Sequence, residues 1–314
     1  MSQITIDAAI FHLSMRRRWP TDVGLQLRMA LTLVLIGVTY LAFITFLYWL
    51  GLDPIFIMAI AGGMLLVQYF FSDKLVLWST GTKIVTPEQA PELHGVVDRL
   101  CAETGIPKPR VGITPTDVPN AFATGRSKRH SVIAATTGLL RRLNPDELQA
   151  VLAHELSHIR NRDVAVITIA SFLSTVAYYF MSSFLYGGMY GGAGGQRDSR
   201  DRGPGLILVY IVSLIVYVVS LLLVRLLSRY RELAADRGSA IITGHPETLI
   251  SALLKISGVM DRMPTKDLRA EQGMNQFFII PAITSRSIMD LFSTHPSLEK
   301  RIQQLERMEQ TMGP

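Results

Sequence analysis

The sequence predicts a mainly α-helical integral membrane protein, with about four transmembrane helices and a domain outside the bilayer that contains a small β-sheet. Three observations support this fold class. Four stretches of the chain are long and almost free of charge, and an apolar helix of about 20 residues spans a bilayer. The segments between and after them have the mixed composition of a soluble α/β domain. One of these segments contains two histidines at the spacing of one helical turn.

The four apolar stretches differ in how clearly they predict a transmembrane helix. Those at 29–50 and 206–224 are the clearest. The stretch at 55–72 is short and contains a pair of glycines, and the one at 164–186 is rich in Ser, Thr and Tyr. Both are therefore also compatible with a buried or re-entrant helix. The first stretch is too long for the apolar part of a cleavable signal peptide.

These stretches divide the chain into five segments, and the domain outside the bilayer is built from two of them. We expect an N-terminal segment at 1–24, a transmembrane hairpin at 25–72, the first part of the domain at 73–163, a second transmembrane hairpin at 164–227 with a Gly-rich loop at 187–205, and the second part of the domain at 228–314. Within the domain, apolar periodicity predicts helices at 87–104 and from 297 onward, and strands at 110–114, 120–125 and 131–137, with a basic turn at 126–129.

The distribution of Lys and Arg predicts the orientation in the membrane. Arginines precede the first apolar stretch and follow the last one, and the segment 73–163 is rich in both residue types. Under the positive-inside rule, both termini and the domain face the cytoplasm of a multi-pass protein in the inner cell membrane. The net charge of +6 is therefore interpreted as membrane orientation, with contact to anionic lipid. Nucleic-acid binding is not expected, because no basic stripe alternates with stacking aromatic residues.

His154, Glu155 and His158 form the pattern H-E-x-x-H, in which two imidazoles project from one helical face and can bind one metal ion. The glutamate then lies beside the open position of the metal, where it can accept a proton from water. A helix is expected because Asn144 precedes Pro145 and two acids, which is a strong helix start. The chain's single cysteine excludes a cysteine-rich metal site.

A catalytic zinc site usually has three protein ligands, so a third is expected elsewhere. The best candidates are Glu232 and Asp236, which are four residues apart on a predicted helix and can point at one locus. One carboxylate can bind the metal while the other accepts a hydrogen bond from a ligand histidine. Asp163 is a weaker candidate for such a hydrogen bond, and His245 and His295 are weaker ligand candidates.

The chain resembles the HtpX family of membrane-bound zinc metalloproteases, which are relatives of the CAAX prenyl proteases. The resemblance extends from the first apolar stretch to the final helix, and its motifs occur in the family's order. Residues 278–281 lack an Asn that some relatives have before the Pro. The matching segments are 120–125 (NAFATG), 154–163 (HELSHIRNRD), 228–236 (SRYRELAAD), 278–281 (FIIP) and 294–301 (THPSLEKR).

The resemblance implies a zincin-like metalloprotease domain with a role for each matching residue. His154, His158 and Glu232 would bind one Zn²⁺ per chain, Glu155 would be the general base, and Asp236 would be the hydrogen-bond partner of His154. His295 and Arg301 would lie near the site, where a cationic donor can stabilise an oxyanion. An edge strand would bind the backbone of the substrate, and its residues are Asn120, Ala121, Phe122, Ala123 and Thr124.

The expected function is hydrolysis of peptide bonds in misfolded or damaged membrane proteins and in unfolded proteins, as part of protein quality control and the stress response. Processing of a defined lipidated substrate, as in the CAAX relatives, is an alternative that requires a deep apolar chamber. A metal transporter would need ionisable residues inside its spans, and the four apolar stretches contain no Asp, Glu, Lys, Arg or His. A zinc-binding scaffold without catalysis would need a closed site with four ligands.

Overall fold

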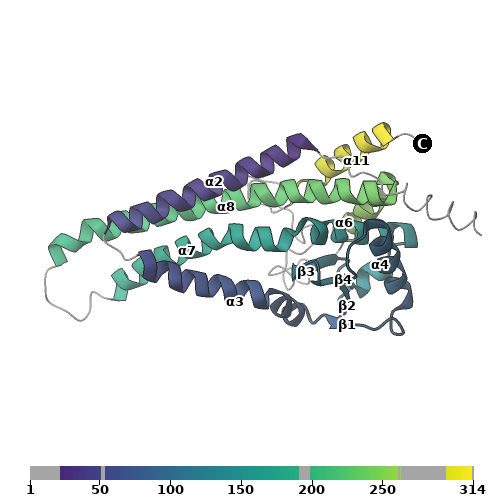
Figure 1. Ribbon diagram of the computed structural model, residues 1–314, viewed down its shortest axis with the longest axis horizontal. Coiled ribbons are helices and arrows are strands. Elements are labelled where there is room, and N and C mark those ends of the chain that lie inside the picture. The colour runs from purple at the N-terminus through teal and green to yellow at the C-terminus, as the bar shows by residue number, and fades with distance from the viewer. Residues whose placement is uncertain (1–21, 51–53, 191–198, 261, 263–294, 313–314) are drawn as a thin grey trace, which may run out of the picture.

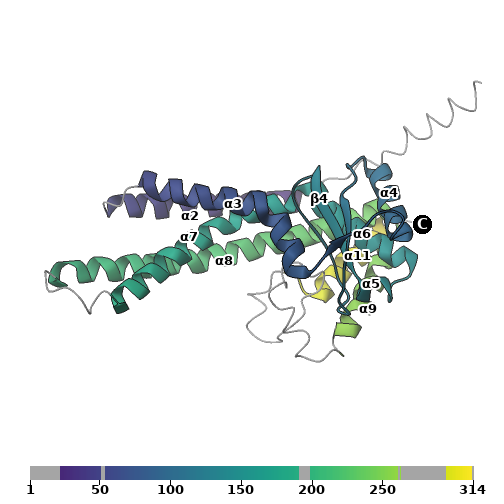
Figure 2. The same cartoon turned by 90° about the horizontal axis from the view of Figure 1, so that it is seen from below.

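A computed structural model of the chain describes residues 22–50, 54–190, 199–260, 262 and 295–312 (Figure 1). Long helices extend in one direction, and a compact α/β domain lies at one end of them (Figures 1 and 2). Three features predicted from the sequence lie outside the described residues: nearly all of the N-terminal segment, the middle of the Gly-rich loop, and the motif at 278–281. The long helices are α2 (Val23–Trp49), α3 (Pro54–Thr80), α7 (Asp163–Tyr190) and α8 (Ser199–Thr243).

Within the part of the chain that the structure describes, three helical segments are long and apolar enough to cross a membrane: Val23–Trp49, Asp163–Ser182 and Ile207–Thr243. Their outward side chains are apolar and exposed, as in Leu31 and Leu41 of α2, which are 57% and 71% accessible. Such a surface is unfavourable in water and favourable in lipid. The remaining predicted stretch, 55–72, lies in α3, and several side chains of this helix are not described. A span at α3, and hence the count of four, stays a prediction.

Helices α7 and α8 are longer than the apolar stretches that predicted them. α7 continues to Tyr190 and α8 begins at Ser199, so both ends of the expected loop 187–205 are helical. Extending an existing helix costs less than starting a new one, which explains why a polar, Gly-containing sequence is included. With 45 residues, α8 is about 68 Å long, more than twice the thickness of the hydrocarbon core. Its C-terminal part therefore extends beyond the apolar stretch and into the domain.

The domain contains a four-stranded sheet of order β1-β2-β4-β3, in which β2 and β4 are parallel and the other pairs are antiparallel. β3 continues two residues beyond the predicted strand, and the turn consists of Lys128 and Arg129 only. Gly125 has a φ of +132°, which disfavours any side chain at this bulge. β1 was not predicted, because two residues give no periodic pattern. The strands are β1 (Lys83–Ile84), β2 (Arg110–Thr114), β3 (Ala121–Ser127) and β4 (His130–Thr136).

Helix α6 (Pro145–Asn161) lies at the centre of the domain, between the sheet and α8. Its start is the predicted one: the Asn144 side chain accepts from the Glu147 backbone N–H, and the Glu147 carboxylate accepts from the Asn144 N–H. Residues 150–153 of α6 are completely buried in the main core. The Ser239 hydroxyl of α8 donates a hydrogen bond of 2.6 Å to the Ala150 carbonyl, and the small alanine lets the two helices come this close.

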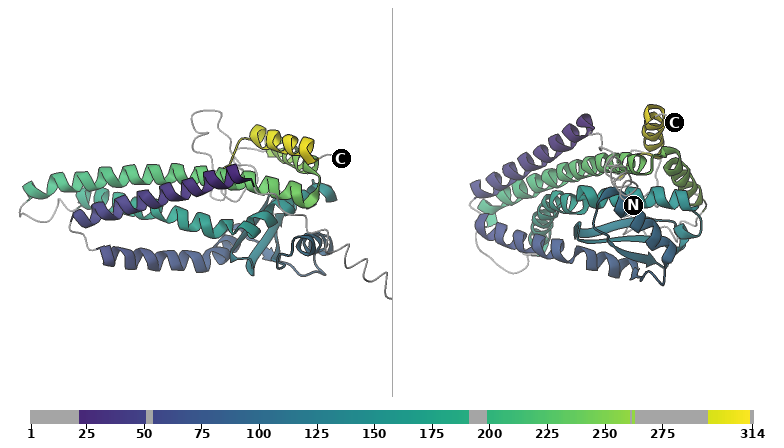
Figure 3. Two further views of the ribbon diagram at one scale, coloured as in Figure 1. Left: turned by 45° about the horizontal axis from the view of Figure 1, so that its top comes forward. Right: turned by 45° about the vertical axis from the view of Figure 1, so that its right-hand side comes forward.

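Four further helices of the domain are described, and the final one lies close to α8 (Figure 3). α9 holds the first turn of α6, because Lys255 and Ser251 both bind the buried Glu147 carboxylate, at 2.6 and 2.7 Å. Burial alone would raise the pKa of Glu147, but the hydrogen bonds from Lys255 and Ser251 outweigh it and lower that pKa. These helices are α4 (Pro91–Thr104), α5 (Thr137–Leu140), α9 (Pro246–Met260) and α11 (Leu298–Met312).

We predict that Lys255→Met lowers the free energy of unfolding at pH 7 by about 1–3 kcal/mol, because it leaves a buried carboxylate without its cation. The pKa of Glu147 is lowered on folding, so its stabilising contribution is present above the unfolded pKa of about 4.3 and is lost as the pH falls through the folded value. The difference between variant and parent should therefore shrink below about pH 4. Denaturant unfolding in detergent, with the exposed Lys300→Met as control, measures this; a pH-independent difference would contradict it.

Candidate metal centre

Helices α6 and α8 bring His154, His158 and Glu232 together at the edge of the domain core. One potential ligand atom from each lies within 4.8 Å of those of the others. The two imidazole Nε2 atoms are 3.1 Å apart. The carboxylate oxygens of Glu232 lie 3.6 Å from the Nε2 of His154 and 3.5 Å from the Nε2 of His158. Two residues predicted to be neighbours on one helix thus meet an acid more than 70 positions later in the chain.

These distances are those expected of the ligands of one tetrahedral ion. Zinc bonds of about 2.0–2.1 Å place neighbouring ligand atoms about 3.3–3.4 Å apart. The three observed separations of 3.1, 3.5 and 3.6 Å bracket this value, although the two imidazoles approach different oxygens of Glu232. The donor set of two imidazoles and one carboxylate is also a known catalytic zinc set. Both the spacing and the chemistry of the residues fit a zinc ion.

The opposite ring nitrogens fix which imidazole atoms face the centre. The Nδ1 of His154 lies 3.0 Å from an Asp236 oxygen, and the Nδ1 of His158 lies 2.6 Å from an Asp163 oxygen. Carboxylates accept protons, so each Nδ1 carries the hydrogen and each Nε2 presents a lone pair. Two such lone pairs at 3.1 Å repel unless a proton or a metal ion lies between them. The hydrogen bonds therefore prepare both histidines for a metal.

Each of these two carboxylates is in turn bound by a buried arginine. Arg301 of α11 holds Asp236 in a bidentate pair, with distances of 2.8 Å from Nε and 2.6 Å from Nη2. Arg231 of α8, which is 4% exposed, forms an ion pair with Asp163. Both histidines are thus oriented by the same arrangement of arginine, carboxylate and imidazole. The spacing of residues in the sequence does not predict the burial of Arg231 beside Asp163.

The electrostatic environment favours positive charge at His154. Burial lowers its pKa, but the hydrogen bonds with Asp236 and Glu232 raise it to about 9. Burial lowers the pKa of His158. Glu155 points from the same helix and is 4% exposed, and burial raises its pKa, which makes it a better proton acceptor. The two histidines and the neighbouring Glu155 therefore lie together inside the domain, as the sequence predicted.

Strand β3 lies beside Glu155 and is an edge strand, because β4 is its only partner among the described strands. The Ala123 backbone N–H donates a hydrogen bond to Glu155, which ties the strand to the helix that bears the histidines. Asn120 immediately precedes the strand and is buried, and its N–H donates to the Thr136 hydroxyl. Residues 121–124 are all buried, including the side chain of Thr124. Substrate binding along this strand stays a prediction.

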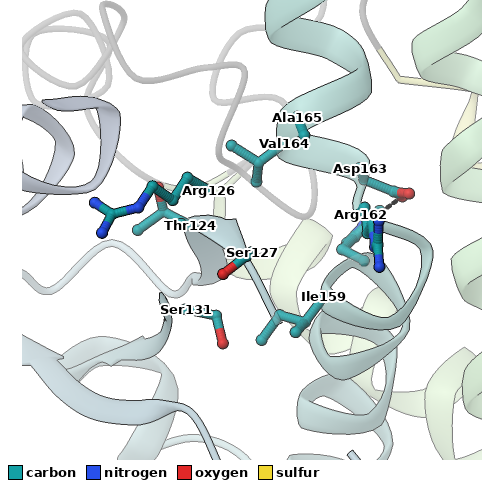
Figure 4. A pocket seen from close by; sticks show the side chains of 11 residues that line it. Thr124, Arg126, Ser127, Ser131, Ile159, Arg162, Asp163, Val164 and Ala165 are labelled. Atoms are coloured by element: carbon teal, nitrogen blue, oxygen red, sulfur yellow. Dashed lines mark hydrogen bonds and ion pairs between the residues drawn. The ribbon is translucent and has the colours of Figure 1, made fainter. Parts of the chain in front are cut away.

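A small cavity lies between β3, the end of α6 and the first turn of α7 (Figure 4), and His158 is among the residues that line it. Figure 4 shows Thr124, Arg126 and Ser127 on the strand side of the cavity, with Ile159, Arg162 and Asp163 facing them. The cavity therefore joins the edge strand to His158, a candidate metal ligand, and to the start of a candidate span. Its lining consists of Thr124, Gly125, Arg126, Ser127, Ser131, His158, Ile159, Arg162, Asp163, Val164 and Ala165.

The remaining candidates are placed differently. The Nδ1 of His295 is 3.3 Å from a Glu232 oxygen, and the Nη1 of Arg301 is 4.0 Å from the same atom, so both lie at the site. Two other nitrogens of Arg301 bind Asp236, which gives it a positioning contact; its role as oxyanion donor stays a prediction, as does a catalytic role of His295. The prediction of His245 as a candidate ligand was wrong. Its ring is exposed and pairs with Glu247 at the turn between α8 and α9.

Comparisons with known proteins show which proteins the chain resembles. Residues 87–309 match the model of "Peptidase family M48". The chain is 57% identical over 299 residues to "Protease HtpX homolog 2" of Methanosarcina acetivorans, covering 95% of this chain and 100% of that protein. It is 55% identical over 298 residues to "Protease HtpX homolog" of Moorella thermoacetica, covering 95% and 99%. The crystal structure of S. mikatae Ste24p matches with a TM-score of 0.56 at 19% identity, covering 91% of this chain and 67% of that one, which shows a shared fold.

We predict that Arg301 and Asp236 are strongly coupled in stability. Arg301→Gln alone should cost about 3–5 kcal/mol, because it leaves a buried carboxylate uncompensated. Adding Asp236→Asn removes that charge, so the double variant should be less destabilised than the sum of the two single variants, by about 1 kcal/mol or more. Denaturant unfolding in detergent measures the cycle, with Arg307→Gln on the exposed face of α11 as control. Additive effects would contradict the pairing.

Proposed function

The chain belongs to peptidase family M48 and is a metalloprotease, and from this premise we propose that it is a zinc-dependent endopeptidase of the membrane. Its substrates would be misfolded or damaged membrane proteins and unfolded proteins. The observation that carries the proposal is the meeting of His154, His158 and Glu232. Glu232 lies on the same helix as the last candidate span, beyond its apolar stretch, so the site is built at the end of a membrane helix.

His154, His158 and Glu232 would hold one zinc ion per chain. Zinc, when bound, supplies Lewis-acid chemistry that polarises a peptide carbonyl and makes water a stronger acid. Three protein ligands leave the position for substrate or water that a catalytic site needs, whereas a zinc scaffold would require a fourth ligand. Among the described residues, the cluster of donor atoms contains these three alone, which favours an enzyme over a scaffold.

Glu155 would move the protons of the reaction. It accepts one from the attacking water and delivers it to the leaving amine, which completes hydrolysis without a covalent intermediate. Its burial raises its pKa toward the range of an effective base, and the hydrogen bond from the Ala123 N–H holds its carboxylate beside the edge strand. A peptide aligned with that strand would present its carbonyl within reach of both the base and the metal ligands.

The free edge of β3 would bind the substrate as an added strand. Pairing with main-chain groups gives affinity without requiring particular side chains. Such binding needs an extended segment, which an unfolded chain or a loop of a damaged membrane protein offers and a folded domain does not. A cytoplasmic site at the membrane surface, with both termini on the same side, would reach both kinds of substrate.

The first test is Glu155→Gln. We expect the variant to retain its zinc and to lose casein cleavage by about 10²- to 10⁴-fold, because the amide cannot accept the proton. Detergent-purified protein is assayed for metal content and for chelator-sensitive casein cleavage in parallel. The matched control is Glu306→Gln on the exposed face of α11, which should change neither readout. Full activity of Glu155→Gln would reject the assigned base.

The second test is Glu232→Ala. It removes one of three ligands, so metal affinity should fall by about 10- to 100-fold or more while Glu155 stays in place. Zinc stoichiometry after dialysis against a competing chelator measures the loss. Excess zinc should restore part of the cleavage if the fold is intact. An unchanged stoichiometry would show that this carboxylate does not bind the metal.

A further inference from the structure

Four basic residues lie at or next to the cavity: two of them line it, and two form the turn of the hairpin that supplies its strand side. Arg126, Lys128 and Arg129 belong to the β3–β4 hairpin, and Arg162 follows the last turn of α6 on the opposite side of the cavity. Arg129 and Arg162 are exposed, and the other two are half-buried. We call these four residues the basic rim. Lys128 and Arg129 do not line the cavity and have no place in the proposed catalysis.

The basic rim lies where the apolar stretch of α3 ends and that of α7 begins. Arg162 directly precedes the candidate span that starts at Asp163. On the other side, the Tyr69 hydroxyl donates a hydrogen bond of 2.8 Å to the Arg126 carbonyl, and the Arg126 guanidinium lies 5.4 Å from the centre of the Phe70 ring. Tyr69 and Phe70 belong to the apolar stretch of α3. Aromatic rings beside arginines are typical of the interface between bilayer and water.

The surface of α3 next to the rim has the same interfacial character. Phe70 and Phe71 are 48% and 49% exposed, and Trp78, two turns later, is 83% exposed. The Lys74 ammonium lies 5.4 Å from the centre of the Phe71 ring. Exposed aromatic and basic side chains on one helix end fit a position in the headgroup region. The hairpin packs against this helix end, as the contact of β3 with α3 shows.

Asp163 in α7 and Asp73 in α3 both form ion pairs with residues outside the rim. Asp163 adjoins Arg162 in sequence, but its carboxylate is already bound by Arg231 and by His158. Asp73 of α3 is paired with Arg110, at 3.0 Å. The rim therefore presents a net positive surface to whatever lies beside it.

We propose that the basic rim binds the phosphates of anionic lipid headgroups, which holds the β3–β4 hairpin and the mouth of the cavity at the membrane surface. An acidic peptide is the other chemistry that would fit. Segments of membrane proteins next to the cytoplasmic surface carry an excess of Lys and Arg, so such substrates would be repelled by the rim. Anionic lipid is attracted to it and is present at high density. The inference goes beyond peptide hydrolysis and does not depend on catalysis.

The experiment measures which lipid lies next to the hairpin. His130 is exposed at the start of β4, and Cys101 is buried, so His130→Cys can be labelled selectively with a fluorophore. The full-length Glu155→Gln protein is placed in nanodiscs. The label is then quenched by phosphatidylglycerol or phosphatidylcholine that carries a nitroxide at the top of the acyl chain. We expect tighter apparent binding of phosphatidylglycerol, weakened by salt.

The key variant is Lys128→Gln with Arg129→Gln. Each basic residue near an anionic surface is worth about fivefold in binding, so the preference for phosphatidylglycerol should fall by about 5- to 25-fold. Lys128→Arg with Arg129→Lys keeps the charge and should keep the preference. The control is Arg99→Gln with Lys108→Gln, at the α4 end of the domain away from the spans (Figure 1). It should behave as the parent.

Two kinds of result would overturn the proposal. One kind comes from the lipid measurement: the lipid preference is unchanged in Lys128→Gln/Arg129→Gln, or neither lipid quenches the label. Absence of quenching would place the hairpin away from the headgroups. The other is a loss of acidic-peptide cleavage in lipid-free detergent that is as large as the loss of lipid preference. It is measured with the same rim substitutions in the enzyme that retains Glu155. That outcome would assign the rim to substrate recognition.

Discussion

The close packing of α6 against α8 is the constraint on which the site depends. The imidazoles come from one helix and the carboxylate from the other, so a shift of about 1 Å between the helices would separate the proposed ligands of a single ion. The fully buried Ala150 and the hydrogen bond from Ser239 to its carbonyl keep the helix axes close. α9 fixes the start of α6 through Glu147, and α11 reaches Asp236 through Arg301. Helices α9 and α11 therefore serve mainly to hold α6 and α8 in register.

The site also concentrates buried charge, which does not by itself stabilise a fold. Three carboxylates (Asp163, Glu232 and Asp236) and two arginines are all buried there. Burying ion pairs costs desolvation energy that their mutual attraction only partly offsets. The gain is orientation: each imidazole is held in one tautomer with its Nε2 toward the centre. The same feature explains why the domain needs a large apolar core around α6 and α9.

Much of this arrangement could be predicted from local sequence. The start of α6 follows from Asn144 and Pro145, and the pairing of the two histidines follows from helical spacing. The prediction that they meet Glu232 was based on the three protein ligands usual for a catalytic zinc ion and on family resemblance. No local sequence pattern indicates a contact across the domain. The burial of Arg231 could not be predicted, since it depends on Asp163, which is distant in sequence. The extension of α7 and α8 into the Gly-rich loop was not predicted, because its glycines indicate a loop whereas the adjoining helices continue into it.

X-ray absorption at the zinc edge of the zinc-loaded, detergent-purified protein tests the central claim most directly. The account predicts a first shell of nitrogen and oxygen atoms at about 2.0–2.1 Å, with the outer scattering of two imidazole rings and one carboxylate. Sulfur in that shell, or the scattering of fewer than two imidazoles, would contradict the convergence of α6 and α8 on one ion.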